Sequence, residues 1–179
     1  MIPISIAEII DVTGADVIQE SEADLCISRI ETDSRHILFP EKTIFFALDG
    51  QYTQGHHFIP ALSKKGVRVF VTHAEAIPEV SGYVLKVNNT LHALQTLAMH
   101  YRKKFAIPVI GITGSNGKTI VKEWLAQLLQ GDFQVCKSPK SYNSQLGVAL
   151  SVLELNDTVE IGIFEAGIST YDEIEVLEQ

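Results

Sequence analysis

A glycine-rich turn between an apolar strand and a helix constrains this chain more than any other feature. The turn reads Thr-Gly-Ser-Asn-Gly-Lys-Thr over residues 113–119, after the apolar run Val109–Ile112 and before a helical pattern over 120–129. Backbone N–H groups in such a turn converge on phosphate oxygens, and the helix N-terminus favours negative charge. The sequence therefore predicts an α/β fold with a phosphate site, although Ile112 stands where the strict pattern GxxxxGK[ST] has its first glycine.

The turn also supplies the side chains that nucleotide chemistry needs. Lys118 can reach the β- and γ-phosphates of ATP, and the Thr119 hydroxyl can bind Mg²⁺. The backbone amides expected to cradle the phosphates belong to Gly114, Ser115, Asn116 and Gly117. A second metal ligand usually comes from a carboxylate at the end of a neighbouring strand, and Glu165 follows the strand pattern 159–164. The alternatives are a glycine-rich turn with an exposed lysine and a solvated carboxylate.

Composition narrows the classes of protein in which such a site occurs. Of the 179 residues, 46% are hydrophobic, which is enough for a sizeable core, and the net charge of −8 argues against broad binding to nucleic acid or anionic membranes. The chain has no apolar run of membrane-spanning length, and its start lacks the features of a signal peptide, so we expect a cytoplasmic protein. Cys26 and Cys136 are expected to be free thiols.

The pattern ahead of the turn predicts a separate, small mixed α/β domain over residues 1–104. Its expected helices cover 5–13, 58–65 and 90–103, and its expected strands cover 26–30, 43–48, 67–72 and 83–87. Residues 105–179 then hold about half of a doubly wound domain, with further strands near 133–136 and 159–164 and a helix near 145–155. An amphipathic pattern over 171–179 has no stop signal, so we expect the chain to be part of a longer protein.

Four runs of residues resemble sequences of the Mur ligase family of peptidoglycan synthesis. The Thr-Gly-Ser-Asn-Gly-Lys-Thr turn is similar to that family's phosphate loop. The run Thr-Asp-Ser-Arg over 32–35 and the run Ile-Phe-Phe-Ala-Leu-Asp-Gly over 44–50 resemble the UDP-binding first domain of the members that add the third residue or the terminal dipeptide. The run Lys-Ser-Tyr-Asn-Ser-Gln-Leu-Gly-Val over 140–148 is similar to the dipeptide-adding members, because those adding the third residue have a Thr-Thr-Pro element there.

The resemblance implies an ATP-dependent ligase that joins D-Ala-D-Ala to UDP-N-acetylmuramoyl-tripeptide through an acyl phosphate. It implies catalytic roles for Lys118, Asn143 and Glu165, with Thr119 and Glu165 holding Mg²⁺. It implies contacts to the UDP end of the substrate from Ser34, Arg35 and Asn88. The family's carbamylated lysine and amine-carrying domain would lie beyond residue 179, so we expect this chain alone not to ligate.

Other interpretations stay open at this point. They are the family member that adds the third amino acid, a small P-loop kinase, and a non-catalytic module that binds UDP-sugars; the oligomeric state is open as well. His56 and His57 have no third ligand spaced around them, so a loop role is favoured over a metal site. Trp124, on the helix after the turn, is expected to have a packing role rather than to stack on a base.

Overall fold

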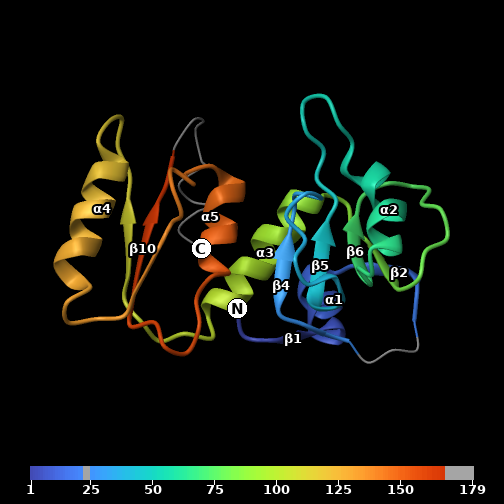
Figure 1. Ribbon diagram of the computed structural model, residues 1–179, viewed down its shortest axis with the longest axis horizontal. Coiled ribbons are helices and arrows are strands. Elements are labelled where there is room, and N and C mark those ends of the chain that lie inside the picture. Colours follow the sequence, from blue (N-terminus) through green and yellow to red (C-terminus); the bar gives the residue numbers. More distant parts are fainter. Residues whose placement is uncertain (22–24, 168–179) are drawn as a thin grey trace. The chain divides into compact units, whose positions relative to one another are not determined.

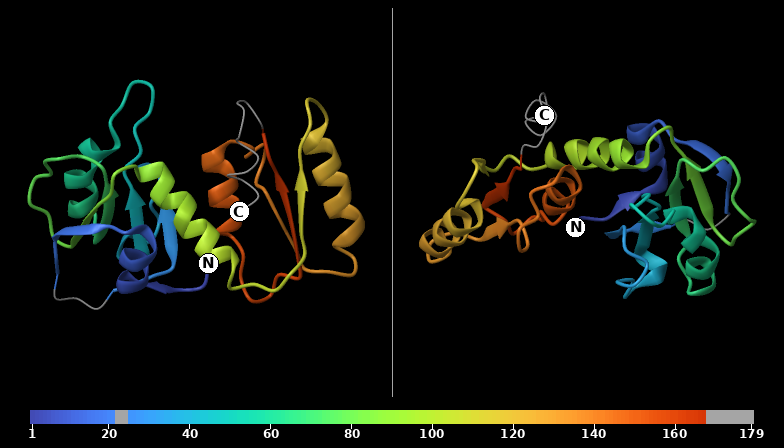
Figure 2. Two further views of the ribbon diagram at one scale, coloured as in Figure 1. Left: turned by 180° about the vertical axis from the view of Figure 1, so that it is seen from behind. Right: turned by 90° about the horizontal axis from the view of Figure 1, so that it is seen from above.

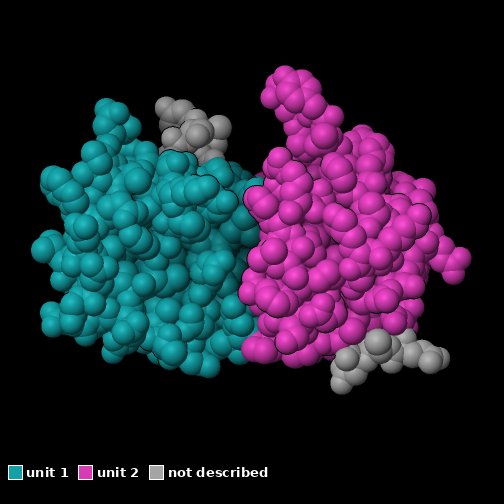
Figure 3. All heavy atoms as spheres, in the orientation of Figure 1, with its two compact units in different colours: residues 1–2, 98–179 teal, residues 3–97 magenta. Residues whose placement is uncertain are grey.

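The computed structural model describes residues 1–21 and 25–167 and divides the chain into two compact units, which Figure 3 colours separately. Unit 2 comprises residues 3–97, and unit 1 comprises residues 1–2 together with the described chain from residue 98 onward. The helix expected over 171–179 lies outside the described residues. Within the described ranges, no helix combines the length and apolar character that crossing a membrane requires.

Unit 2 is built on a five-stranded sheet with the order β2-β7-β6-β5-β4. The strands are β2 (Asp16–Gln19), β4 (Arg29–Glu31), β5 (Thr43–Phe46), β6 (Val69–Thr72) and β7 (Tyr83–Lys86). The last four are parallel, whereas β2 pairs antiparallel with β7 at the edge. Every residue of β5 and β6 is buried, as expected for central strands of a sheet covered on both faces. A separate antiparallel pair joins β1 (Ile4–Ser5) to β3 (Cys26–Ile27).

Short helices connect and cover the strands of unit 2. They are α1 (Ile6–Thr13), α2 (Ile59–Lys64), the 3-10 helices η1 (Pro40–Lys42) and η2 (Gly55–Phe58), and the first part of α3 (Thr90–Arg102), whose residues from 98 onward belong to unit 1. The predicted start and stop of α1 are confirmed: the Ser5 hydroxyl accepts a hydrogen bond from the Glu8 N–H, and Gly14 ends the helix with a φ of 62°. Figure 1 shows α2 beside the sheet, and Ile59 and Leu62 of this helix share one buried apolar cluster with Phe45 and Phe70.

Unit 1 is a three-stranded parallel sheet with helices on both faces. The order β8-β10-β9 places β10 (Ile161–Glu165) between β8 (Val109–Ile112) and β9 (Val135–Lys137). Helices α4 (Lys118–Leu129) and α5 (Gln145–Val152) lie on opposite faces of this sheet (Figures 1 and 2). The predicted fold class, a mixed α/β unit followed by part of a doubly wound domain, is therefore confirmed.

Two structural predictions need correction. The expected strand over 26–30 divides into β3 and β4. Strand β2 was not predicted, because Val17 and Ile18 are exposed and a register shift removes the alternation of apolar and polar residues. Trp124 does not pack in the core: 67% of its surface is exposed. The buried face of α4 carries Lys122 and Ala126. Trp124 is two positions after Lys122, which places it about 200° around the helix, on the opposite side.

Candidate functional site

The phosphate loop lies at the carboxyl edge of the unit 1 sheet. Ile112, the last residue of β8, is in register with Glu165, the last residue of β10, so the loop and this carboxylate leave the same edge. Gly114 and Gly117 have φ values of 136° and 78°, which residues with a side chain rarely adopt. Gly117 is the N-cap of α4 and has no side chain to bond the first amides of the helix. The predicted strand, turn and helix are confirmed, and the N-terminus of α4 points its N–H groups into the loop.

Lys118 lies across this loop rather than extending away from it. Its Nζ donates a hydrogen bond to the Gly114 carbonyl, at 2.7 Å. The side chain is partly buried, while the loop residues 113–117 are exposed. The loop itself thus holds the ammonium group where it can meet an anion bound by the backbone amides.

Thr119 and Glu165 form the second element of the site. The Thr119 Oγ1 donates to Glu165 Oε2 at 3.1 Å, and the Glu165 side chain has no exposed surface. Glu165 Oε1 is also buried and, among the described residues, receives no hydrogen bond of good geometry. A carboxylate with spare acceptor capacity beside a hydroxyl is a donor set suited to Mg²⁺, which takes one or two protein ligands and completes its shell with phosphate and water. The residues therefore fit the metal that the family implies.

Lys122 is the part of the site that the sequence analysis missed. Its side chain has no exposed surface, and its Nζ lies 2.9 Å from Glu165 Oε1. The same ammonium group donates to the Ser138 carbonyl at 2.7 Å and to the Lys140 carbonyl. A signal was present in the sequence: Lys122 precedes Ala126 by one helical turn and so occupies the apolar face of the helix.

Asn143 lies at the same edge of the sheet as Glu165. The Gly167 N–H, two residues after Glu165, donates to the Asn143 carbonyl at 2.6 Å. A Cβ at residue 167 would lie 2.8 Å from that carbonyl and 3.3 Å from the Asn143 side chain, so the close approach needs glycine. The structure thus brings the Asn143 carbonyl close to the segment that follows Glu165, and Glu165 close to Thr119 at the end of the phosphate loop.

Arg35 in unit 2 is bound to its own neighbour. Its Nε and Nη2 donate to the two Asp33 carboxylate oxygens at 2.9 and 2.6 Å, and 81% of its side chain is exposed. The hydrogen bonds from Arg35 hold the pKa of the Asp33 carboxyl well below its usual range. Asp33 therefore fixes the side of the guanidinium that carries Nε and Nη2, and the remaining N–H groups of Arg35 are not part of this pair.

The predicted substrate residues share one edge of the unit 2 sheet but do not form one cluster. Ser34 and Arg35 follow β4, whereas the exposed Asn88 follows β7, three strand spacings or about 14 Å across the sheet. Two side chains that we did not predict, Asp49 and His73, follow the intervening strands β5 and β6. Asp49 Oδ2 lies 3.3 Å from His73 Nε2, and the other ring nitrogen of His73 lies 3.1 Å from the hydroxyl of Thr90, at the start of α3.

Comparison with known proteins links the two units to one family. Residues 26–102 match the family model described as "Mur ligase family, catalytic domain", and residues 112–179 match "Mur ligase middle domain". The UDP-N-acetylmuramoyl-tripeptide--D-alanyl-D-alanine ligases of Bacillus subtilis (strain 168) and Synechocystis sp. are 34% and 36% identical to this chain. The alignments cover 84% and 86% of the chain but only 33% and 34% of those proteins.

Solved structures agree with the sequence matches. A crystal structure of MurF from Acinetobacter baumannii superposes with a TM-score of 0.89 at 28% identity, covering 98% of this chain and 38% of that one. The MurF ligase of Thermotoga maritima in complex with ADP superposes with a TM-score of 0.74 at 29% identity, covering 83% of this chain and 34% of that one. The chain spans about a third of the length of the curated relatives it matches. With a domain of the same family matched on either side of residue 105, the chain belongs to the Mur ligase family.

Proposed function

We propose that this chain supplies the substrate-binding and ATP-binding parts of a ligase that joins D-Ala-D-Ala to UDP-N-acetylmuramoyl-tripeptide in the cytoplasm. The observation that carries the proposal is the contact between Thr119 and the buried Glu165 at the head of the P-loop helix, because these two side chains would hold the metal of a bound nucleotide. The names of the relatives that match at 34% and 36% identity support the dipeptide-adding reaction over addition of the third amino acid.

The two parts of the chain have separate tasks in this proposal. Residues 1–104 bind the UDP end of the muramoyl peptide, and residues 105–179 bind ATP. The matched Thermotoga maritima structure, which holds ADP, supports nucleotide binding by a protein of this kind. Because the chain spans about a third of its relatives, the complete reaction belongs to the protein at its full natural length.

The chemistry begins with phosphoryl transfer to the terminal carboxylate of the tripeptide. A carboxylate oxygen attacks the γ-phosphorus, the bond to the bridging oxygen of ADP breaks, and an acyl phosphate forms. Lys118 would offset negative charge on the transferring phosphoryl group, and the loop amides would orient the phosphates. Gly117, the N-cap of α4, has no side chain that would compete with a phosphate for these amides. Thr119 and Glu165 would hold Mg²⁺, which offsets negative charge on the β- and γ-phosphates when bound. Asn143, whose carbonyl accepts a hydrogen bond from the Gly167 N–H, would contact the nucleotide or the metal.

The second half of the reaction forms the peptide bond. The D-Ala-D-Ala amine attacks the carbonyl carbon of the acyl phosphate, the tetrahedral intermediate expels inorganic phosphate, and the amine loses a proton. Orientation of the two reactants contributes much of such a rate enhancement. Ser34, Arg35 and Asn88 would fix the UDP end of the acceptor for this purpose.

The direct test is phosphate release by the protein at its full natural length. The proposal predicts release only when ATP, UDP-N-acetylmuramoyl-tripeptide and D-Ala-D-Ala are all present. Release with a UDP-muramoyl dipeptide and a single amino acid would indicate the third-residue ligase instead. Phosphate transfer to an alcohol would indicate a kinase, and binding of the UDP substrate without any turnover would indicate a non-catalytic module.

Arg35 provides a test of the UDP site. Arg35→Ala should weaken binding of the UDP-muramoyl peptide by about 10- to 100-fold, because charge-assisted hydrogen bonds are worth about 1.5–3 kcal/mol. Arg68→Ala is the matched control, since Arg68 precedes β6 and so lies at the opposite edge of the same sheet. Calorimetry that gives equal substrate affinities for the two variants would remove Arg35 from the site, and ATP affinity should be unchanged in both.

Lys118 and Thr119 test the ATP site. Lys118→Ala removes the ammonium group that the loop holds, so turnover should fall sharply while binding of the UDP substrate is retained. Thr119→Ala should lower turnover in a way that raised Mg²⁺ partly restores, because one metal ligand is lost. Normal turnover by Lys118→Ala would contradict phosphoryl transfer at this loop.

A further inference from the structure

We infer that Lys122 is a positioning residue that holds the Glu165 carboxylate in place for the metal, an inference that rests on the function proposed above. Lys122 lies one turn after Lys118 on the P-loop helix, but it points into the protein and has no exposed surface. Its Nζ is 2.9 Å from Glu165 Oε1, and Glu165 is buried as completely.

Burial of this lysine needs compensation, because an ammonium group loses its hydration there. The compensation comes from one short segment as well as from Glu165: the carbonyl groups of Ser138 and Lys140 both accept hydrogen bonds from Lys122. Lys140 has a φ of 51°, and it is the single residue other than glycine with positive φ in the described chain. Lys122 therefore ties α4 to the segment that leads on to Asn143.

The helix contacts both oxygens of the carboxylate. Thr119 and Lys122 are three residues apart and so share one face of α4. The Thr119 hydroxyl bonds Oε2 and the Lys122 ammonium group lies against Oε1, while the Glu165 N–H donates to the Ser138 Oγ at 3.0 Å. These contacts fix the position and the rotation of the carboxylate. The Lys122 contact leaves Oε1 without a well-directed hydrogen bond, and hence with lone pairs for a metal ion.

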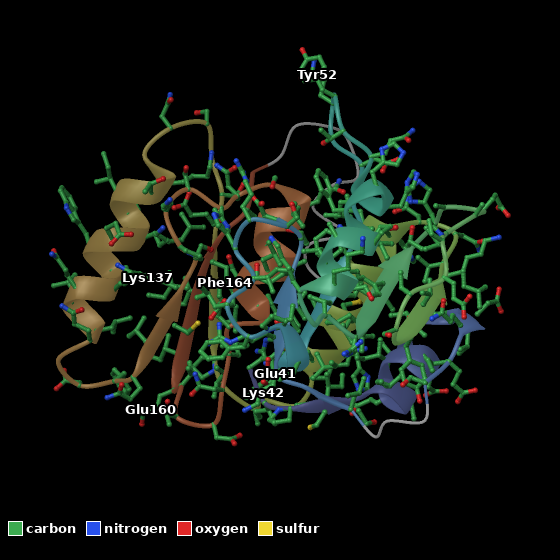
Figure 4. The ribbon with its side chains drawn as sticks, turned by 45° about the vertical axis from the view of Figure 1, so that its right-hand side comes forward. Glu41, Lys42, Tyr52, Lys137, Glu160 and Phe164 are labelled. Atoms are coloured by element: carbon green, nitrogen blue, oxygen red, sulfur yellow. The ribbon has the colours of Figure 1, made fainter. Side chains whose placement is uncertain are left out.

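A second lysine nearby provides a matched control. Lys137 of β9 pairs with Glu123 of α4, and 40% and 43% of their side chains are exposed; Figure 4 labels Lys137. The hydrogen bond from Lys137 is the main cause of the lowered pKa of Glu123. This pair joins α4 to the sheet, as the Lys122 pair does. Glu123 Oε1 also lies 3.3 Å from Lys122 Nζ, but the ion pair of Lys137 is with Glu123 and not with Glu165.

The experiment measures metal binding without turnover, in the protein at its full natural length. ADP affinity is measured by calorimetry with saturating Mg²⁺ and with EDTA, and the ratio of the two dissociation constants gives the gain due to the metal. Lys122→Met should reduce this gain by about 10- to 100-fold, as loss of a residue that orients a metal ligand does, with ADP affinity in EDTA unchanged. Lys137→Met should change neither value. A wild-type gain in Lys122→Met would overturn the inference.

A double-mutant cycle with Glu165→Gln shows whether Lys122 acts through Glu165. Once Glu165 is replaced, adding Lys122→Met should change the gain in ADP affinity due to Mg²⁺ by less than about threefold. If the double variant instead shows the product of the two single effects, the inference is overturned. If Lys122→Met alone does not fold, the double variant, which has no unpaired buried carboxylate, is compared with Glu165→Gln by the same criterion. A wild-type gain in Glu165→Gln would instead refute the metal role in the proposed function, and this inference with it.

Discussion

Replacing Tyr101 with phenylalanine removes one hydroxyl group from the interior of unit 1. Tyr101 lies in the last turn of α3 and has no exposed surface, and its burial raises the pKa of the phenol. The hydroxyl accepts a hydrogen bond from the Ile2 N–H at 2.6 Å and donates one to the Leu155 carbonyl at 2.7 Å. One side chain thus joins the start of the chain, the end of α3 and the segment after α5.

The expected loss can be worked out from these two bonds. Leu155 has no exposed surface, so its carbonyl loses a donor in the interior, at a cost of about 1–3 kcal/mol. The bond to the partly buried Ile2 contributes about 1 kcal/mol more. Together the free energy of unfolding should fall by about 2–4 kcal/mol. With a denaturant slope of about 2 kcal/mol per molar urea, the unfolding midpoint should fall by about 1–2 M.

Urea titrations followed by circular dichroism and by Trp124 fluorescence provide the assay. Trp124 is the single tryptophan of the sequence and lies in unit 1, so its signal reports on the unit that contains Tyr101. Tyr52→Phe is the control, because Tyr52 is 88% exposed at the tip of the loop after β5 (Figure 4) and should change stability by less than about 0.5 kcal/mol. An equally small effect of Tyr101→Phe would refute this account of unit 1.

Two further predictions concern the backbone of unit 2 and the thiols. Gly55→Ala should destabilise unit 2 by about 1–3 kcal/mol in urea titrations, because its Cβ would lie 2.4 Å from the Leu48 carbonyl oxygen; Gly131→Ala, with nothing within 4 Å, should be nearly neutral. Burial raises the pKa of Cys136 from 9.0 to about 11. At pH 9 a thiol reagent should therefore modify the exposed Cys26 much faster than Cys136, and equal rates would contradict the burial of Cys136. Because the fold favours the neutral Cys136 thiol, its contribution to stability is present below pH 9 and is lost as the pH rises from 9 to about 11.

Local signals in the sequence predicted most of the fold. Ser5 and Gly14 mark the ends of α1 because capping depends on neighbours in the chain, and the apolar runs of β5 and β6 reflect strands that are buried on both faces. The two-residue strand β1 and the exposed edge strand β2 were missed. Their formation depends on partners far along the chain, and two exposed apolar residues give no alternating pattern.

In the candidate site too, features that depend on neighbouring residues could be predicted, and contacts between distant residues could not. Residues whose geometry is local, such as Gly117 and Lys118 in the phosphate loop, could be predicted from the sequence. Glu165 could be predicted as well, because the ends of parallel strands meet at one edge of a sheet. The spacing of Lys122 and Ala126 places Lys122 on the apolar face of α4, but its pairing with Glu165 could not be predicted, since that partner is more than forty residues away and a lysine on an apolar face is expected to extend to solvent. The contact between Asp49 and His73 was missed for the same reason.

Oxygen labelling tests most directly whether the tripeptide carboxylate is activated as an acyl phosphate, as proposed above. UDP-N-acetylmuramoyl-tripeptide labelled with ¹⁸O in its terminal carboxylate is incubated with ATP, Mg²⁺, D-Ala-D-Ala and the protein at its full natural length. Because the oxygen that attacks the γ-phosphorus leaves with the phosphate, each phosphate released should contain one ¹⁸O atom by mass spectrometry. Release of unlabelled phosphate at the rate of product formation would contradict the acyl phosphate. Release of unlabelled phosphate in the absence of D-Ala-D-Ala would contradict it as well.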